Sequence, residues 1–131
     1  MNTAKYLLAV LPLIALAGCV PAPIEGRADT YTPAQLNFTS RDLRSDTAVG
    51  KIQLRKDESG ILHVDVPIRN TTLIQLEADY RISFVDQNGM LIEGPNGWTS
   101  VTLPPNVWQD IQVNSASPRA TDFHMDLRPA Q

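Results

Sequence analysis

Alternation of apolar and polar residues is the strongest pattern along the chain. Over residues 76–84 every second residue is apolar and the residues between them are polar or charged. This period of two predicts a β-strand with one buried face and is incompatible with an amphipathic helix. Residues 62–68 repeat the pattern, with His63, Asp65 and Pro67 on the outward face. Because Pro67 has no N–H for a sheet ladder, we expect this strand at an edge or beside a bulge.

Turn residues separate the predicted strands. Residues 57–60 (Asp-Glu-Ser-Gly) and 86–89 (Asp-Gln-Asn-Gly) are typical turns, and the Asn-Gly pair predicts that residues 90–93 return as a hairpin partner. Thr32 followed by Pro33 predicts one short helical turn over residues 32–35. The other predicted strands cover residues 48–56, 98–103, 107–113 and 121–127.

Short strands at regular intervals, separated by Gly, Pro and Asn, indicate an all-β domain. We expect residues 32–131 to form a single immunoglobulin-like or fibronectin-like β-sandwich of about seven strands. Cys19 is the only cysteine, so the disulfide of antibody domains is excluded and the core alone must stabilise the domain.

The first residues have the layout of a bacterial lipoprotein signal. Lys5 precedes an apolar stretch at 6–16, which is shorter than the roughly 20 residues that a membrane-spanning helix needs. Leu16, Ala17, Gly18 and Cys19 then match the lipobox, in which a signal peptidase recognises the small residues and the cysteine sulfur receives lipid. The alternative is an ordinary secretory signal with an incidental cysteine.

This layout predicts the division of the chain. Residues 1–18 are a lipoprotein signal peptide, and residues 19–31 are the lipidated cysteine with a flexible tether rich in Pro and Ala. The acyl chains on Cys19, palmitate among them, anchor the protein to a membrane lipid layer. In similar lipoproteins an Asp after the cysteine retains the protein in the inner membrane. Val20 stands there, so the resemblance implies the outer membrane, with the domain facing the periplasm.

Charge and motifs exclude several functions. The chain is mildly acidic and has no basic run, so nucleic-acid binding is not expected. No nucleophile elbow, phosphate-binding loop or zinc helix occurs, and we predict neither enzymatic activity nor a cofactor. Neither His63 nor His124 has a convincing set of partners for metal binding or acid–base chemistry. His124 shares a strand face with Asp122 and Asp126, which suits a divalent ion, but any solvated strand face gives such a row and no metal is predicted.

Three side chains are candidates for a partner surface. We expect at least one of Trp98 and Trp108 in the core, with Trp108 the more exposed because its parity differs from that of Ile111 and Val113. Arg119 follows Pro118 in a stiffened loop, where it either presents its guanidinium to a partner or makes an internal salt bridge, and we favour the salt bridge.

Four blocks of sequence resemble a known family. They are Arg69-Asn70-Thr71-Thr72, the stretch from Tyr80 to Gly89, Gly97-Trp98, and the stretch from Ala116 to Phe123. In order and spacing they are similar to the YcfL-like lipoproteins, over residues 61–128. The resemblance implies a periplasmic β-sandwich lipoprotein of Gram-negative bacteria, a domain of unknown function without established catalytic residues.

The expected function is a non-catalytic adaptor of the cell envelope that contacts another periplasmic protein through a sheet edge or through the loops near Trp98 and Arg119. One alternative is a structural outer-membrane lipoprotein subunit of an envelope machine such as a type VI secretion system. The other is a small metal-binding accessory or hydrolase that uses His63 or His124.

Overall fold

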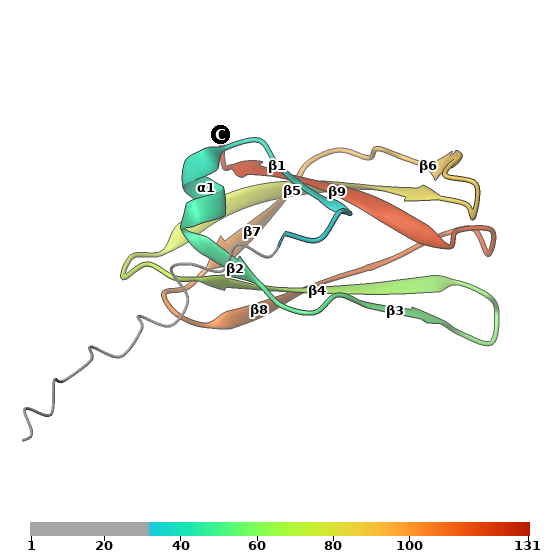
Figure 1. The fold of residues 1–131 in the computed structure, drawn as a ribbon, viewed down its shortest axis with the longest axis horizontal. Helices are drawn as coiled ribbons and strands as arrows, with labels where there is room; N and C mark the ends of the chain where they lie inside the picture. Colours follow the sequence, from blue (N-terminus) through green and yellow to red (C-terminus); the bar gives the residue numbers. More distant parts are fainter. Residues whose placement is uncertain (1–31) are drawn as a thin grey trace, which may run out of the picture.

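Two β-sheets pack face to face in the computed structural model, which describes residues 32–131 (Figure 1). The elements are β1 (Leu36–Phe38), α1 (Arg41–Ser45), β2 (Thr47–Val49), β3 (Gln53–Lys56), β4 (Leu62–Asn70), β5 (Leu76–Val85), β6 (Leu91–Glu93), β7 (Thr99–Leu103), β8 (Trp108–Asn114) and β9 (Asp122–Pro129). The first sheet has the order β1-β9-β5-β6, and β7 also pairs with β5. The second has the order β2-β4-β3, and β8 also pairs with β4. The predicted all-β sandwich is confirmed.

The core lies between the two sheets. Four inward residues of β4 (Leu62, Val64, Val66 and Ile68) and three of β9 (Phe123, Met125 and Leu127) are each at most 2% exposed and belong to one apolar cluster. The period of two therefore predicted the buried faces of both strands correctly, because successive side chains of a strand point to opposite faces.

The predicted hairpin after β5 is also confirmed. The N–H of Asp86 donates to the carbonyl of Met90 at 2.9 Å, and Gly89 takes a φ of 76°, which glycine adopts without steric cost. β6 then pairs with β5 beyond a bulge between Phe84 and Val85.

The predicted strand over residues 48–56 is two strands, β2 and β3, separated at residues 50–52. Both pair with β4, whose other side pairs with β8. The expected edge position of Pro67 is therefore wrong, because β4 lies inside its sheet. The Pro67 carbonyl accepts from the Gly50 N–H at 2.9 Å, so Pro67 lies opposite the gap between β2 and β3, where the ladder on this side of β4 is interrupted.

The helical turn predicted over residues 32–35 is wrong. There the chain makes only a hydrogen-bonded turn, with the Leu36 N–H donating to the Pro33 carbonyl at 3.0 Å. The helix is α1, and it begins after Ser40, whose hydroxyl accepts from the Leu43 N–H at 3.3 Å. Ser40 is the N-cap and the buried Leu43 attaches the helix to the core.

The predictions for residues 1–31 lie outside the described residues. They concern the signal peptide with Leu16, Ala17 and Gly18, the lipidated Cys19 and the tether. Within residues 32–131, no helix is long and apolar enough to cross a membrane.

Candidate functional site at the free edge of the second sheet

β8 is an edge strand with one unpaired side. It pairs only with β4, in antiparallel register from His63↔Asn114 to Arg69↔Trp108. The Ser115 N–H donates to the Leu62 carbonyl at 2.9 Å, which identifies the even-numbered residues of β4 as those that bond toward β8. Their β8 partners are odd-numbered, so the even-numbered residues of β8 turn their backbone groups away from β4.

These outward backbone groups belong to Trp108, Asp110, Gln112 and Asn114. Among the described residues no other strand pairs with them. β8 has seven residues, against five in β7 and three or four in the remaining edge strands. It holds neither Pro nor Lys, the residues that commonly protect an edge, so β8 offers the longest free template for another strand.

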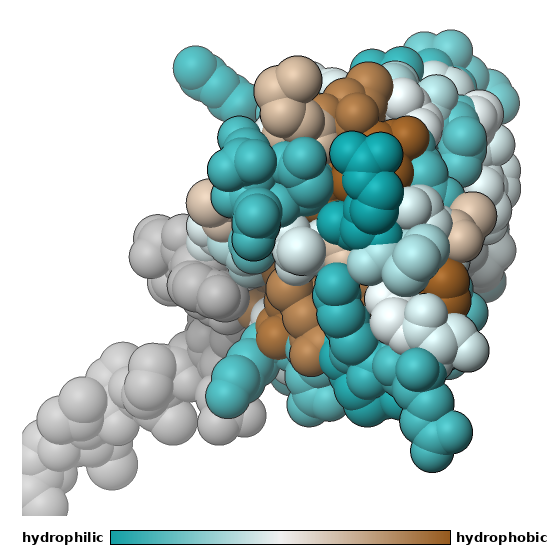
Figure 2. All heavy atoms as spheres, turned by 90° about the vertical axis from the view of Figure 1, so that its right-hand side faces the viewer, coloured by the Kyte–Doolittle hydropathy of each residue, from teal (hydrophilic) through white to brown (hydrophobic). Residues whose placement is uncertain are grey.

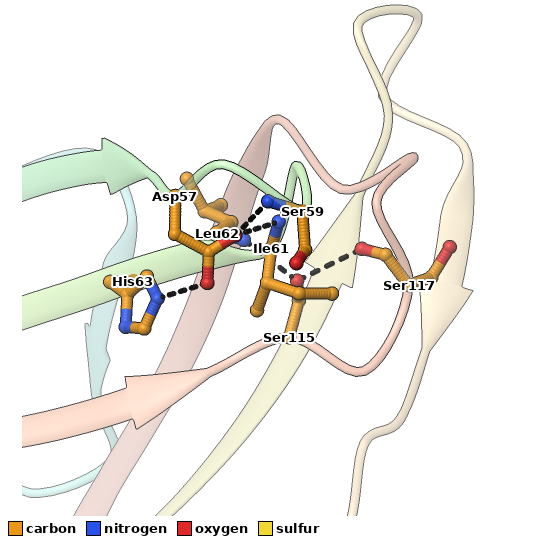
Figure 3. Close-up of polar contacts among 7 residues, drawn as sticks. All are labelled: Asp57, Ser59, Ile61, Leu62, His63, Ser115 and Ser117. Carbon is orange, nitrogen blue, oxygen red and sulfur yellow. Dashed lines mark hydrogen bonds and ion pairs between the residues drawn. The ribbon is translucent and has the colours of Figure 1, made fainter.

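The end of β8 is fixed by a polar cluster at the turn between β3 and β4, shown in Figure 3. The hydroxyl of Ser115 accepts from the Leu62 N–H at 3.0 Å and donates to the Ser117 carbonyl at 2.9 Å. A side chain thus replaces the carbonyl that would continue the ladder, and the strand stops at Asn114.

In the same cluster the carboxylate of Asp57 holds the turn together. One oxygen accepts from the N–H groups of Ser59 and Ile61 at 2.8 and 3.1 Å, and the other lies 2.8 Å from Nε2 of His63 (Figure 3). The hydrogen bond with His63 holds the pKa of the Asp57 carboxyl below its ordinary value of 3.8. Asp57 therefore holds His63 in a turn that positions β4, a contact that the alternating pattern did not indicate.

The outer face of the second sheet is hollowed beside β8, across β3 and β4. The hollow is lined by Lys51, Gln53, Arg55, His63, Asp65 and Gln112, with four further residues. Asp65 is the unusual member, since one carboxylate oxygen is buried without a hydrogen-bond partner. Burial raises the pKa of Asp65, and the nearby negative charge of Asp110 raises it further.

We predict that Asp65→Asn makes the domain more stable at pH 7. Because the folded-state pKa of Asp65 lies above its unfolded value, its ionised form costs stability at neutral pH, and this cost vanishes as pH falls below the unfolded pKa. Urea unfolding at pH 7 and pH 3 measures the effect. The variant should unfold at higher urea only at pH 7, and a variant less stable than wild type at pH 7 would contradict the prediction.

Trp108 stands at the start of β8 on the outer face. It is 49% exposed, and the guanidinium of Arg69 lies 5.2 Å from its ring centroid. A Cβ on Gly50 would lie 3.3 Å from the same ring, so glycine at residue 50 leaves room for the indole. Trp108 is the surface aromatic that the sequence predicted.

Trp98 lies on the opposite side of the molecule, on the outer face of the first sheet. The guanidinium groups of Arg128 and Arg81 lie 4.0 and 4.7 Å from its ring centroid. Those arginines pair with Asp79 and Asp126 at 3.2 and 2.8 Å. The expectation of at least one tryptophan in the core is therefore wrong, because cationic side chains cover Trp98 instead.

Arg119 lies in the loop after β8, at the far end of that strand from Trp108. Its side chain is exposed, and over residues 32–131 it makes no ion pair, so the favoured internal salt bridge is wrong. Trp98 and Trp108 thus lie on the outer faces of different sheets, and Arg119 lies beyond the end of β8 that is far from Trp108.

In the row Asp122, His124 and Asp126 on β9, the carboxylate of Asp126 is engaged by residues of other strands. Asp126 accepts hydrogen bonds from Asn37 at 2.9 Å and Arg81 at 2.8 Å, and these bonds hold its pKa below the ordinary value. His124 is exposed. Over the described residues no group of three or more His, Cys, Asp and Glu side chains is placed to hold a metal ion.

Sequence reasoning missed the free edge of β8 and the buried Asn70. Strand order is a property of the assembled sheet, so no local pattern in residues 108–114 reveals which side stays unpaired. Asn70 is 0% exposed, and the only available signal was its place in the Arg-Asn-Thr-Thr block.

Comparison with known proteins agrees with this fold. The family described as "Protein of unknown function (DUF1425)" matches residues 34–129. The crystal structure of Campylobacter jejuni cj0090 is similar, with a TM-score of 0.63 and 17% identity over 73% of this chain and 98% of that chain. A DUF1425 family member from Shewanella sp. pv-4 has a TM-score of 0.57 and 20% identity over 65% and 79% of the two chains. No curated protein matches.

Proposed function

Since the chain belongs to the DUF1425 family, whose function is unknown, we propose a role from its own residues. The protein is a YcfL-like outer-membrane lipoprotein, anchored through Cys19, whose periplasmic domain is a non-catalytic adaptor. It binds an extended segment of another envelope protein along the free edge of β8. The observation that carries this proposal is the row of outward backbone groups on β8, which no described strand pairs.

Strand addition explains why these groups are left exposed. An unpaired edge is a hazard for aggregation, and natural domains usually protect it with Lys, Pro or a bulge. β8 has none of these over its seven residues and pairs with β4 in unbroken register. A peptide strand that pairs here gains main-chain hydrogen bonds, and its alternate side chains supply specificity.

The faces of β8 define the chemistry of the partner. Toward the core the strand presents Ile111, which is buried, and Val113, which is half-buried. Toward the outer face it presents Trp108, Asp110 and Gln112. The partner segment therefore carries apolar side chains on one face, beside Val113, and polar side chains on the other, with a basic residue near Asp110.

A non-catalytic role is supported by the hydrogen bonds that the polar side chains already make within the fold. Asp57 and His63 are engaged in a turn, and Asp126 is held by Asn37 and Arg81. An acid–base catalyst needs a partner group that can reach a substrate, whereas these carboxylates hold the fold.

Crosslinking in intact cells tests the adaptor role. The protein is crosslinked, purified under denaturing conditions from the outer-membrane fraction, and the attached protein is identified in wild type, Trp108→Ala and Arg119→Ala. We expect one discrete partner, weakened in Trp108→Ala because Trp108 begins β8, and unchanged in Arg119→Ala because Arg119 lies beyond the strand. A protein that fractionates with the outer membrane but yields no partner would contradict the adaptor role.

A further inference from the structure

Three exposed apolar side chains lie at one end of the sandwich, and Met90 and Leu91, 64% and 60% exposed, form a smaller pair at the opposite end. Leu73 and Ile74, in the loop between β4 and β5, are 94% and 67% exposed, and Val107, in the loop between β7 and β8, is 47% exposed. We call these three residues the apolar tip. A group of neighbouring exposed aliphatic side chains is a candidate interaction surface.

The two loops of the apolar tip are fastened to each other. The buried amide of Asn70 donates to the carbonyls of Ile74 at 2.6 Å and Leu103 at 2.9 Å. The main-chain carbonyl of Asn70 accepts from the Asn106 N–H at 2.8 Å. Hydrogen bonds of Asn70 therefore fix both loops of the apolar tip in place.

The described chain begins beside α1, which lies at the same end of the sandwich as the apolar tip (Figure 1). Thr32 accepts a hydrogen bond from Arg44 of α1 at 2.6 Å. Directly after α1, the Asp46 carbonyl accepts from the N–H of Thr71 in the loop of the apolar tip at 2.9 Å. Figure 1 shows α1 and the loops from β4 to β5 and from β7 to β8 at the same end of the sandwich.

The two loops of the apolar tip are uncharged, although α1 at the same end contains Arg41, Asp42 and Arg44 (Figure 1). The loops at residues 71–75 and 104–107 contain no charged residue. At the opposite end the turns contain Asp57, Glu58 and Asp86, and the loop after β8 contains Arg119. Figure 2 looks onto that opposite end, where apolar residues form separate patches among polar ones.

We propose that the apolar tip docks into the interfacial region of the membrane that holds the lipid anchor. This inference rests on the proposed lipidation of Cys19. Residues 20–31, fully extended, reach at most about 40 Å, so an anchored Cys19 keeps Thr32, and α1 beside it, within about that distance of the bilayer. An uncharged loop pair with exposed Leu and Ile side chains suits the interface between headgroups and acyl chains, because it buries apolar area without burying a charge.

Docking at the apolar tip also orients the domain. β8 begins at Trp108, next to Val107, and runs away from the apolar tip to Asn114. With the apolar tip in the membrane, the free edge of β8 points into the periplasm, where a partner segment can reach it.

Quenching by brominated lipid tests the docking. The natively lipidated full-length protein is purified, the mass of the Cys19 segment is measured, and the protein is placed in phosphatidylethanolamine and phosphatidylglycerol vesicles with brominated acyl chains. A bimane label is introduced at Gln75→Cys beside the apolar tip or, as control, at Asn88→Cys in the turn at the opposite end. Lipidation leaves no thiol on Cys19, so each label is unique.

We expect quenching of the Gln75→Cys label and none of the Asn88→Cys label. Adding Leu73→Ser and Ile74→Ser should reduce quenching to the Asn88→Cys level while the protein still floats with the vesicles, and adding Met90→Ser and Leu91→Ser at the opposite end should not. Equal quenching of both labels in floating protein would overturn the docking alone. A Cys19 segment without lipid would overturn both the docking and the proposed anchor.

Discussion

Replacing Asn70 with Ala is expected to lower the free energy of unfolding by about 3 kcal/mol, because each buried polar group left without a partner costs roughly 1–3 kcal/mol. The Asn70 side chain is fully buried and bonds Ile74, Leu103 and Thr72 at 2.6 to 2.9 Å. Its loss removes the side-chain donor to the Leu103 carbonyl and the acceptor of the Thr72 N–H. Urea denaturation of the soluble domain measures the change.

Asn114→Ala is the matched control for this prediction. Asn114 is also the last residue of a strand, but it is exposed and its side chain makes no hydrogen bond with a described residue. A change within about 0.5 kcal/mol is expected there. Equal effects of the two variants would show that Asn70 does not clamp the loops.

Gln112→Pro is expected to reduce capture of the partner by about tenfold or more, because the added strand loses a main-chain hydrogen bond and meets the proline ring. The Gln112 N–H faces away from β4, so the fold keeps its ladder and proline is tolerated, as on other edge strands. Crosslinking yield in cells, with thermal unfolding of the purified variant alongside, measures both effects.

Val113→Pro is the neighbouring control. The N–H of Val113 faces Val64 of β4, so its loss breaks the ladder inside the sheet. This variant should lower the unfolding temperature more than Gln112→Pro does. If Gln112→Pro keeps full partner capture at wild-type stability, strand addition at β8 is wrong.

Local patterns predicted the elements whose causes are local. The alternation over residues 76–84 fixed which face of β5 is buried, and Asn88-Gly89 placed the hairpin, because strand pleat and turn conformation depend on neighbouring residues. The helix at Arg41–Ser45 was missed although Ser40 supplies an N-cap, since Pro33 offered a competing start.

Features that depend on strand order escaped prediction. Pro67 indicated an edge, yet it lies in an interior strand opposite a gap between β2 and β3. Trp98 was expected in the core and is instead covered by Arg81 and Arg128, which come from strands far apart in the chain. The unpaired side of β8 escaped prediction for the same reason, because it depends on which strands pair with β4 in the assembled sheet.

A photoreactive side chain at Gln112 in living cells tests the central claim most directly. Thr102 on β7, the next-longest edge strand, is the control position. The account predicts a discrete crosslinked partner from Gln112, attached through an extended segment with alternating apolar residues, and little or none from Thr102. Equal crosslinking from both positions, or none from Gln112 in anchored protein, would contradict it.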